Sequence, residues 1–312
     1  TLLSIERIGN YVLISLVTGA AGFIGSNLVE YLLDQGHEVV CVDNESANNE
    51  KFHWHTKTYN VNVDITDYKG MKNVFTNVKY VFHLAAESRL QPAIENPIQA
   101  VHRNCVGTTV MLQCAREAGV KRFVYSSTSS GYGNNPYPNV ETQPDDCLNP
   151  YSASKIAGEK FCKMYTNLYG LETVTLRYFN VFGNRSPRRG QYAPVIGIFQ
   201  RQKEAGQPLT IVGDGSQRRD FIHVKDVARA NYLAATLPLN GHEGEVFNVG
   251  SGKAYSIQQI ADSISDNQVY IDKRSGEMQT TFADITKIGE VIGWKPEIDV
   301  IDWINEQKQI SI

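Results

Sequence analysis

The stretch that decides the fold is Thr18–Gly25, with the sequence TGAAGFIG. It follows the apolar run Tyr11–Val17 (YVLISLV), which predicts a buried strand, and it opens Phe23–Leu33, whose apolar residues have helical spacing. A strand, a glycine-rich turn and a helix in direct succession are typical of the first unit of a dinucleotide-binding sheet. The N–H groups at the start of such a helix are available to phosphates.

Each glycine of this turn has its own physical role. Gly19 permits the tight turn, and Gly22 lacks the Cβ that would keep the backbone away from a pyrophosphate. Gly25 lets the helix pack closely on the strand. The next predicted strand, His37–Val42, leads to Asp43, whose carboxylate can bind adenosine ribose hydroxyls and would repel a 2′-phosphate. The pattern therefore predicts NAD rather than NADP as the cofactor.

Strands and helices alternate through the first half of the chain. The further predicted strands are Thr58–Val63, Lys79–Leu84, Arg122–Ser126 and Thr173–Arg177, and the further predicted helices are Tyr68–Phe75, Ile98–Glu117 and Pro150–Tyr169. This alternation predicts an α/β fold, a Rossmann-type doubly wound parallel sheet with helices on both faces. We expect an NAD-binding domain over residues 1–181, rejoined by an edge strand at 245–249. A smaller C-terminal substrate-binding α/β domain would then cover residues 182–312.

Composition limits the partners that the chain could bind. The 312 residues carry a net charge of −3, which gives no electrostatic reason to expect nucleic acid or an anionic membrane as a partner. No apolar run approaches the roughly 20 residues of a spanning helix, and the first ten residues lack the features of a secretory signal. Five cysteines without Cys-x-x-Cys spacing suggest reduced thiols. We expect a cytoplasmic protein, and no metal site, since His53 and His55 lack a matching cluster.

Tyr151 and Lys155 form a Tyr-x-x-x-Lys pattern at the start of a predicted helix. Asn149 suits the N-cap and Pro150 the first helical position. One turn apart, the two side chains share a helix face. A nearby ammonium and the positive end of the helix stabilise a phenolate, so we predict a Tyr151 pKa lowered from ~10 toward the range of a general base.

Hydroxyl groups gather where the predicted strand Arg122–Ser126 ends, because Ser126–Gly133 has the sequence SSTSSGYG. Ligands of such sheets bind at the carboxyl ends of the strands. We therefore expect these hydroxyls beside the cofactor and Tyr151, where they can polarise a substrate oxygen. Asp64, after the strand Thr58–Val63, is open to two interpretations: it could bind the adenine or cap a helix.

In these features the chain resembles the extended short-chain dehydrogenase/reductase family, within its nucleotide-sugar epimerase and dehydratase branch. The resemblance runs from about Tyr11 to Ile301. It rests on TGAAGFIG, His83–Ala86 (HLAA), Asn104-x-x-Gly107-Thr108, Thr128–Gly133, Tyr151 with Lys155, Arg177–Gly183 (RYFNVFG), Arg219–Val224 (RDFIHV), and Arg274–Glu277 with Ala283-Asp284.

This resemblance implies roles for individual residues. Tyr151 would be the catalytic base, Lys155 its partner and a ligand of the nicotinamide ribose, and Thr128 the assisting hydroxyl. The implied cofactor-binding residues are Gly19, Gly22, Phe23, Ile24, Gly25, Asp43, Asn44, Asp64, Ile65, Leu84, Ala85, Ala86, Asn104, Tyr151, Lys155 and Tyr178.

The resemblance also implies a nucleotide-sugar site. Arg219 and Arg274 match the family's phosphate-binding arginines, whose forked guanidinium suits bidentate contacts. Glu277 resembles the acid that holds the uridine ribose, and Asn180 the amide near the sugar and diphosphate. The remaining candidate substrate-binding residues are Ser129, Ser130, Tyr192, Val195 and Thr281.

Two positions point to one branch of the family. Dehydratases have an Asp-Glu pair directly after the position of Thr128, where this chain has Ser129 and Ser130, so elimination is disfavoured. Epimerases restricted to plain hexoses have a bulky Tyr at the place of Thr281, and the smaller residue leaves room for a 2-N-acetyl group. The chain therefore looks most like the UDP-N-acetylglucosamine 4-epimerases, which invert C4 through a 4-keto intermediate and also act on UDP-glucose and UDP-galactose.

Alternatives remain open at this stage. A UDP-glucuronate 4-epimerase is one. Arg89 has no assigned role, and such an extra cation, or the hydroxyls of Ser129 and Ser130, could hold the carboxylate of a uronate sugar. A dehydratase or decarboxylase is less favoured without the acid pair. A non-catalytic NAD sensor is disfavoured by the intact Tyr-x-x-x-Lys pattern. By resemblance, we also expect a homodimer formed through Ile98–Glu117 and Pro150–Tyr169.

Overall fold

The computed structural model describes residues 13–47, 51–188, 193–272 and 279–310. Seven parallel strands form its main sheet in the order β11-β6-β5-β4-β1-β2-β3. Their bounds are β1 Ile14–Thr18, β2 Glu38–Asp43, β3 Tyr59–Asn62, β4 Val78–His83, β5 Arg122–Thr128, β6 Glu172–Tyr178 and β11 Val246–Val249. The strand order reverses between β1 and β4, which is where such sheets bind ligands. The predicted doubly wound parallel sheet is confirmed.

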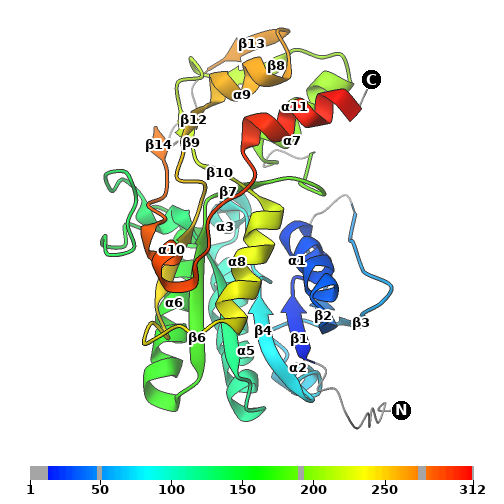
Figure 1. Ribbon diagram of the computed structural model, residues 1–312, viewed down its shortest axis with the longest axis vertical. Coiled ribbons are helices and arrows are strands. Elements are labelled where there is room, and N and C mark those ends of the chain that lie inside the picture. Colours follow the sequence, from blue (N-terminus) through cyan, green and yellow to red (C-terminus); the bar gives the residue numbers. More distant parts are fainter. Residues whose placement is uncertain (1–12, 48–50, 189–192, 273–278, 311–312) are drawn as a thin grey trace.

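Helices cover both faces of the sheet (Figure 1). On one face, α1 (Phe23–Asp34) and α8 (Val224–Thr236) share a buried apolar core with the strands. On the other face, α2 (Tyr68–Lys72), α5 (Gly107–Glu117) and α6 (Pro150–Tyr169) form a second core. No helix among the described residues combines the length and apolar character that a membrane crossing needs.

Two predicted helices differ from the structure. The segment Ile98–Glu117 is not one regular helix, because a π-helical turn, His102–Val106, separates α4 (Pro97–Val101) from α5. Such a turn changes the backbone hydrogen bonds to the i→i+5 pattern within a helical segment, and apolar spacing alone does not predict it. The helix predicted over Tyr68–Phe75 ends at Lys72. A further short helix, α3 (Leu90–Glu95), follows β4.

The elements after β6 gather beyond one end of the sheet, apart from those that return to it (Figure 1). They are β7 Asn180–Phe182, α7 Val195–Glu204, β8 Leu209–Val212, β9 Arg218–Arg219, β10 Phe221–His223, β12 Tyr255–Ser256, α9 Ile257–Ile264, β13 Gln268–Ile271, β14 Thr280–Thr281 and α11 Val300–Ile310. Phe199, Ile211 and Trp303 belong to a separate core there. Helix α10, Thr286–Ile292, instead packs beside β11 and shares the core of the main sheet. The boundary at residue 182 stays a prediction; α8 and β11 both pack with the main sheet.

Candidate active site

A cavity of about 730 Å³ lies at the carboxyl ends of the strands. Its lining includes Gly19 directly after β1, Asp43 at the end of β2, Leu84 directly after β4, Thr128 at the end of β5 and Tyr178 at the end of β6. Five neighbouring strands therefore each deliver a residue to one space at the topological switch point, as the fold requires of a ligand site.

The glycine-rich turn is built for close approach to a ligand. Gly19 has a φ of +68°, and a Cβ there would lie 2.9 Å from the backbone nitrogen of Ala85. A Cβ on Gly25 would lie 2.0 Å from the carbonyl oxygen of Gly19, so only glycine lets α1 meet the turn. Among the described residues, no side chain caps the start of α1 at Gly22. This uncapped helix start, which lines the cavity, fits a diphosphate.

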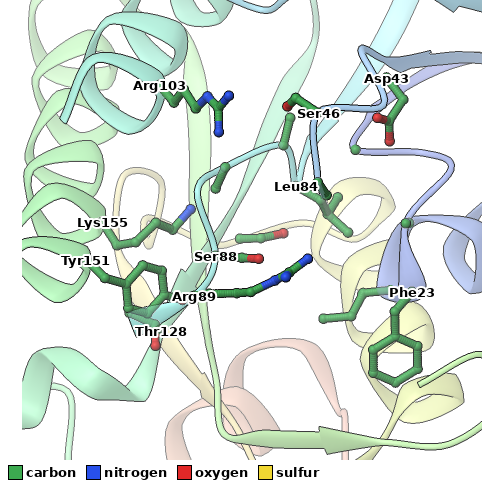
Figure 2. A pocket seen from close by; sticks show the side chains of 18 of the residues that line it. Phe23, Asp43, Ser46, Leu84, Ser88, Arg89, Arg103, Thr128, Tyr151 and Lys155 are labelled. Carbon is green, nitrogen blue, oxygen red and sulfur yellow. The ribbon is translucent and has the colours of Figure 1, made fainter. Parts of the chain in front are cut away.

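Acceptor groups occupy the far end of the cavity from α6 (Figure 2). The Asp43 carboxylate accepts hydrogen bonds from the backbone N–H groups of Ala21 (3.1 Å) and Glu45 (2.9 Å). Burial raises the pKa of Asp43, and these two N–H groups work against that rise. The carboxylate therefore secures the glycine turn while it faces the place predicted for the ribose.

Asn44 and Asp64 extend this end of the cavity, together with Ile65. The Asn44 side-chain amide donates to an Asp64 carboxylate oxygen at 2.7 Å. The helix-cap interpretation of Asp64 is wrong, because Asp67 caps α2 by accepting from the N–H of Gly70. Asp64 instead accepts from the backbone and hydroxyl of Thr66 and keeps its carboxylate at the cavity wall.

Tyr151, Lys155 and Thr128 meet at the opposite end of the cavity (Figure 2). The local sequence sets this arrangement as predicted: Asn149 accepts a hydrogen bond from the N–H of Ser152 at 2.9 Å, and Pro150 fills the first turn. Helix α6 therefore begins where Tyr151 and Lys155, one turn apart, both face the cavity.

The prediction that the pKa of Tyr151 is lowered is wrong. Burial raises the pKa of Tyr151, although a hydrogen bond with Thr128 opposes the rise. Burial also lowers the pKa of Lys155 to about 8, against the opposing influence of Cys162 and Glu159. The Lys155 ammonium lies 4.3 Å from the centre of the Tyr125 ring. The cost of burying a phenolate, which sequence spacing cannot show, therefore outweighs the expected benefit from the lysine.

The other predicted cofactor residues divide into two groups. Phe23, Ile24, Ala85 and Ala86 line the cavity, as does Tyr178, whose hydroxyl is 2.8 Å from that of Ser126. Asn104 lies in the π-helical turn and does not line the cavity.

Asn104 instead lies behind the cavity wall, where its side chain connects two elements. Its side chain accepts from the backbone N–H of Glu87 (2.7 Å) and donates to the hydroxyl of Ser154 (2.9 Å). It thereby joins the loop after β4 to α6.

Three predicted substrate residues gather around Asp220. The Asn180 side chain donates to the Asp220 carbonyl at 2.9 Å, and the Asp220 N–H donates to the Thr281 carbonyl at 2.9 Å. Arg219 and Thr281 are register partners in β9 and β14. The buried Asp220 carboxylate accepts from the N–H groups of Ser251, Gly252 and Ala283. Asn180, Arg219 and Thr281 are not part of the described cavity lining.

The remaining predicted substrate residues lie beside the cavity or outside the described part of the chain. Ser129 and Ser130 begin a 3₁₀ turn, Ser129–Tyr132, in which the N–H of Ser130 donates to the Thr128 hydroxyl at 3.1 Å. Val195 is the first residue of α7, and its predecessors Ala193 and Pro194 line the cavity. Tyr192, Arg274 and Glu277 lie outside the described residues.

The structure adds cavity residues that the sequence analysis did not assign. Ser126 and Ser127 line the wall, as expected for hydroxyl groups at this end of β5, although neither was assigned a separate role. Arg103 also lines the cavity and forms an ion pair with Glu87 at 2.9 Å, a contact without a local sequence signal. Arg89, unassigned before, extends into the space between Tyr151 and Phe23 (Figure 2).

Comparisons with known proteins identify the family of the chain. The model of the NAD dependent epimerase/dehydratase family matches residues 15–250. A putative UDP-glucose 4-epimerase of Methanocaldococcus jannaschii is 37% identical over 94% of this chain and 99% of its own length. A UDP-glucuronate 4-epimerase of Thermodesulfobacterium geofontis is 33% identical over 95% of this chain and 97% of its own.

A solved structure is similar throughout the chain. It is the UDP-N-acetylglucosamine 4-epimerase from Methanobrevibacter ruminantium in complex with UDP-N-acetylmuramic acid. The TM-score is 0.88 at 33% identity, and the match covers 96% of this chain and 99% of that one. The family predicted from the motifs is therefore confirmed: the chain belongs to the NAD-dependent epimerase/dehydratase family, and its cofactor is NAD.

Proposed function

We propose that the protein is a UDP-sugar 4-epimerase that interconverts UDP-N-acetylglucosamine and UDP-N-acetylgalactosamine, and also UDP-glucose and UDP-galactose, through a 4-keto intermediate. The observation that carries this proposal is the meeting of Tyr151, Lys155 and Thr128 in the cavity that the glycine turn borders. Inversion at C4 is also the activity named for the relatives above.

Each of these residues has a defined part in the reaction. Tyr151 takes the proton of the sugar 4-hydroxyl, helped by the hydrogen bond from Thr128 that stabilises its phenolate. NAD held along the glycine turn and Asp43 would supply the hydride chemistry at C4, as acceptor and then as donor to the other face of the sugar. Tyr151 then gives its proton back to the 4-keto oxygen. The positive charge of Lys155 supports the phenolate that takes the first proton and that is restored at the end of the cycle. No proton or electron is consumed over the cycle.

Two features favour an N-acetylated sugar and disfavour elimination. Thr281 is small and buried, and lies beside Arg219 in neighbouring strands, which would leave space for a 2-N-acetyl group near the diphosphate. Ser129 and Ser130 supply no carboxyl pair, so no acid and base stand after Thr128 to remove water from the sugar.

One observation favours a second candidate, a UDP-glucuronate 4-epimerase. The Arg89 side chain extends into the cavity, with its guanidinium between Tyr151 and Phe23 (Figure 2). A guanidinium is well suited to a bidentate contact with a carboxylate, which the uronate sugar carries. The chemistry at C4 would be the same, and only the group at C6 would differ.

A panel of UDP-sugars separates these candidates. Purified protein is incubated without added NAD with UDP-N-acetylglucosamine, UDP-glucose and UDP-glucuronate, and the products are separated by anion-exchange chromatography. A C4 epimer of the N-acetylated sugar supports the first candidate, and conversion of the uronate alone supports the second. A 4-keto-6-deoxy product or released carbon dioxide would instead indicate a dehydratase or decarboxylase.

We also propose that the protein forms a homodimer through α4, α5 and α6. These adjacent helices expose apolar side chains, among them Ile98 (82% exposed) and Leu168 (65% exposed). Burial of such side chains between copies would remove apolar surface from water. Light scattering should give a dimer for the native chain and a folded monomer for the double variant Ile98→Glu/Leu168→Glu; a native monomer would contradict the proposal.

A further inference from the structure

A buried ion pair lies directly behind the catalytic residues. Glu159 follows Lys155 by one turn of α6, and Arg177 precedes the cavity residue Tyr178 in β6. The Arg177 guanidinium donates to both carboxylate oxygens of Glu159, at 2.9 and 2.8 Å, and the two side chains are only 3% and 2% exposed. Removing one partner of such a pair leaves an uncompensated buried charge.

The Glu159 carboxylate also reaches the strand that carries Thr128. The hydroxyl of Ser127, itself a cavity residue, donates to a Glu159 oxygen at 2.5 Å. One carboxylate thereby joins α6, β5 and β6. These are the three elements that supply Lys155, Thr128 and Tyr178 to the cavity.

Further contacts hold Arg177 in place. It donates to Asp145 at 2.9 Å, and its guanidinium lies 4.6 Å from the centre of the Tyr132 ring. The Tyr132 hydroxyl in turn donates to Asn248 of β11 at 2.7 Å. The arginine is therefore fixed from several sides, and Glu159 is held to one position relative to β5.

We propose that Glu159 and Arg177 form a positioning pair for the catalytic site, holding the Ser127–Thr128 end of β5 against the Tyr151–Lys155 turn of α6 and placing a negative charge near the Lys155 ammonium. This inference rests on the proposed epimerase function. A well-packed apolar pair could serve stability alone as well as a buried ion pair does. The link to Ser127 and the nearness to Lys155 are what a merely structural pair would not need.

The electrostatic part of this role has a definite sign. Burial lowers the pKa of Lys155 to about 8, and Glu159 is one of the groups that work against this fall. The groups that face or interact with Lys155 are Tyr125 of β5, His83 of β4, Cys105 of the π-helical turn, and Tyr151, Glu159 and Cys162 of α6. Glu159→Gln removes a negative charge, so the Lys155 pKa should fall further.

The test measures Glu159→Gln by kinetics and by cofactor binding. We expect kcat for UDP-N-acetylglucosamine to fall about tenfold with KM changed less than about twofold, because the groups that act at C4 are misplaced. The alkaline limb of the pH profile should move down by roughly 0.5–1 pH unit. Calorimetric titration of the apoprotein with NAD at a series of pH values should show that the affinity of Glu159→Gln for NAD begins to fall at a lower pH than that of the native protein.

The matched control is Glu172→Gln. Glu172 pairs with Arg122 at 2.7 Å and joins the same two strands, β5 and β6, at the end away from the cavity. Its removal should leave both the pH profile and the NAD titration unchanged. Ser127→Ala, which keeps the ion pair but loses the link to β5, should lower kcat without moving the alkaline limb.

Folding and function are kept apart by two further measurements. If Glu159→Gln does not fold by circular dichroism, the double variant Glu159→Gln/Arg177→Gln removes both charges and is expected to give the same displaced NAD titration. If the native protein does not convert UDP-sugars, the proposed epimerase function is wrong. The positioning role of Glu159 and Arg177 can then still be decided by the NAD titrations of the native protein and the variants. If a folded Glu159→Gln protein binds NAD with the same pH dependence as the native protein, the inference is wrong.

Discussion

The ammonium of Lys155 lies 4.3 Å from the centre of the Tyr125 ring, over the face of a buried aromatic residue of β5. This cation–π contact compensates part of the desolvation of the ammonium. The contact favours the charged lysine and therefore works against burial, which lowers the pKa of Lys155 to about 8.

The first prediction concerns the decline of kcat/KM at alkaline pH. Burial lowers the pKa of Lys155 to about 8, and its protonated form is the one that supports the phenolate. Activity should therefore be present below this pH and decline as the pH rises through it. Initial rates with UDP-N-acetylglucosamine across the alkaline range measure this limb; a rate that stays flat to the range of a free lysine, ~10.4, would show that Lys155 is not the titrating group.

Asp43→Asn should weaken NAD binding and reduce the preference over NADP. The charged carboxylate accepts from the N–H groups of Ala21 and Glu45 and faces the predicted ribose position. The loss of a charge-assisted contact should raise the Kd for NAD by about tenfold or more. Calorimetry of the apoprotein with both cofactors measures the change.

The control for this variant is Asp67→Asn, the same chemical change at the N-cap of α2, outside the described cavity lining. Asparagine caps helices about as well as aspartate, so NAD affinity should not change. Equal losses in the two variants would mean that Asp43 acts through fold stability and not through the cofactor.

Thr281→Tyr should depress turnover of UDP-N-acetylglucosamine far more than that of UDP-glucose. The side chain is only 6% exposed on β14, next to Arg219 of β9, so a larger ring there would take up the space of a 2-N-acetyl group. A difference of about tenfold or more between the two substrates is expected from steric exclusion. Competition between both sugars in one reaction gives the ratio of kcat/KM directly.

The neighbouring variant Thr280→Tyr is the control, because alternate residues of a strand point to opposite faces. It should leave the ratio of the two substrates near its native value. If Thr281→Tyr slows both sugars equally, residue 281 does not select the substituent at C2.

The sequence predicted the parts of the site that local residues determine. Thr18–Gly25 contains its whole turn within eight residues, and Asn149 with Pro150 fixes the start of α6 by contacts within one turn. The strand β5 runs past the predicted end at Ser126, because its pairing with β6 continues to Thr128 and a single strand does not show this.

Contacts between distant segments could not be predicted in this way. Asp220 joins residues 180, 251 and 281, and Arg177 pairs with Glu159 across two elements, so neither leaves a periodic signal. The pKa of Tyr151 is a further example, because burial, which raises it, depends on the packing around the cavity. The π-helical turn around Asn104 lies inside a segment that the sequence predicts as one helix.

In the proposed reaction the Tyr151 hydroxyl moves the proton of the reacting sugar hydroxyl, and Tyr151→Phe removes that hydroxyl alone. Retention of bound NAD and a native melting curve would verify the fold, and Tyr169→Phe, at the exposed end of the same helix, is the control. We predict that Tyr151→Phe lowers kcat for C4 inversion by roughly 10²-fold or more while Tyr169→Phe retains native turnover. Native turnover in a folded, NAD-loaded Tyr151→Phe enzyme would show that the Tyr151 hydroxyl does not move this proton.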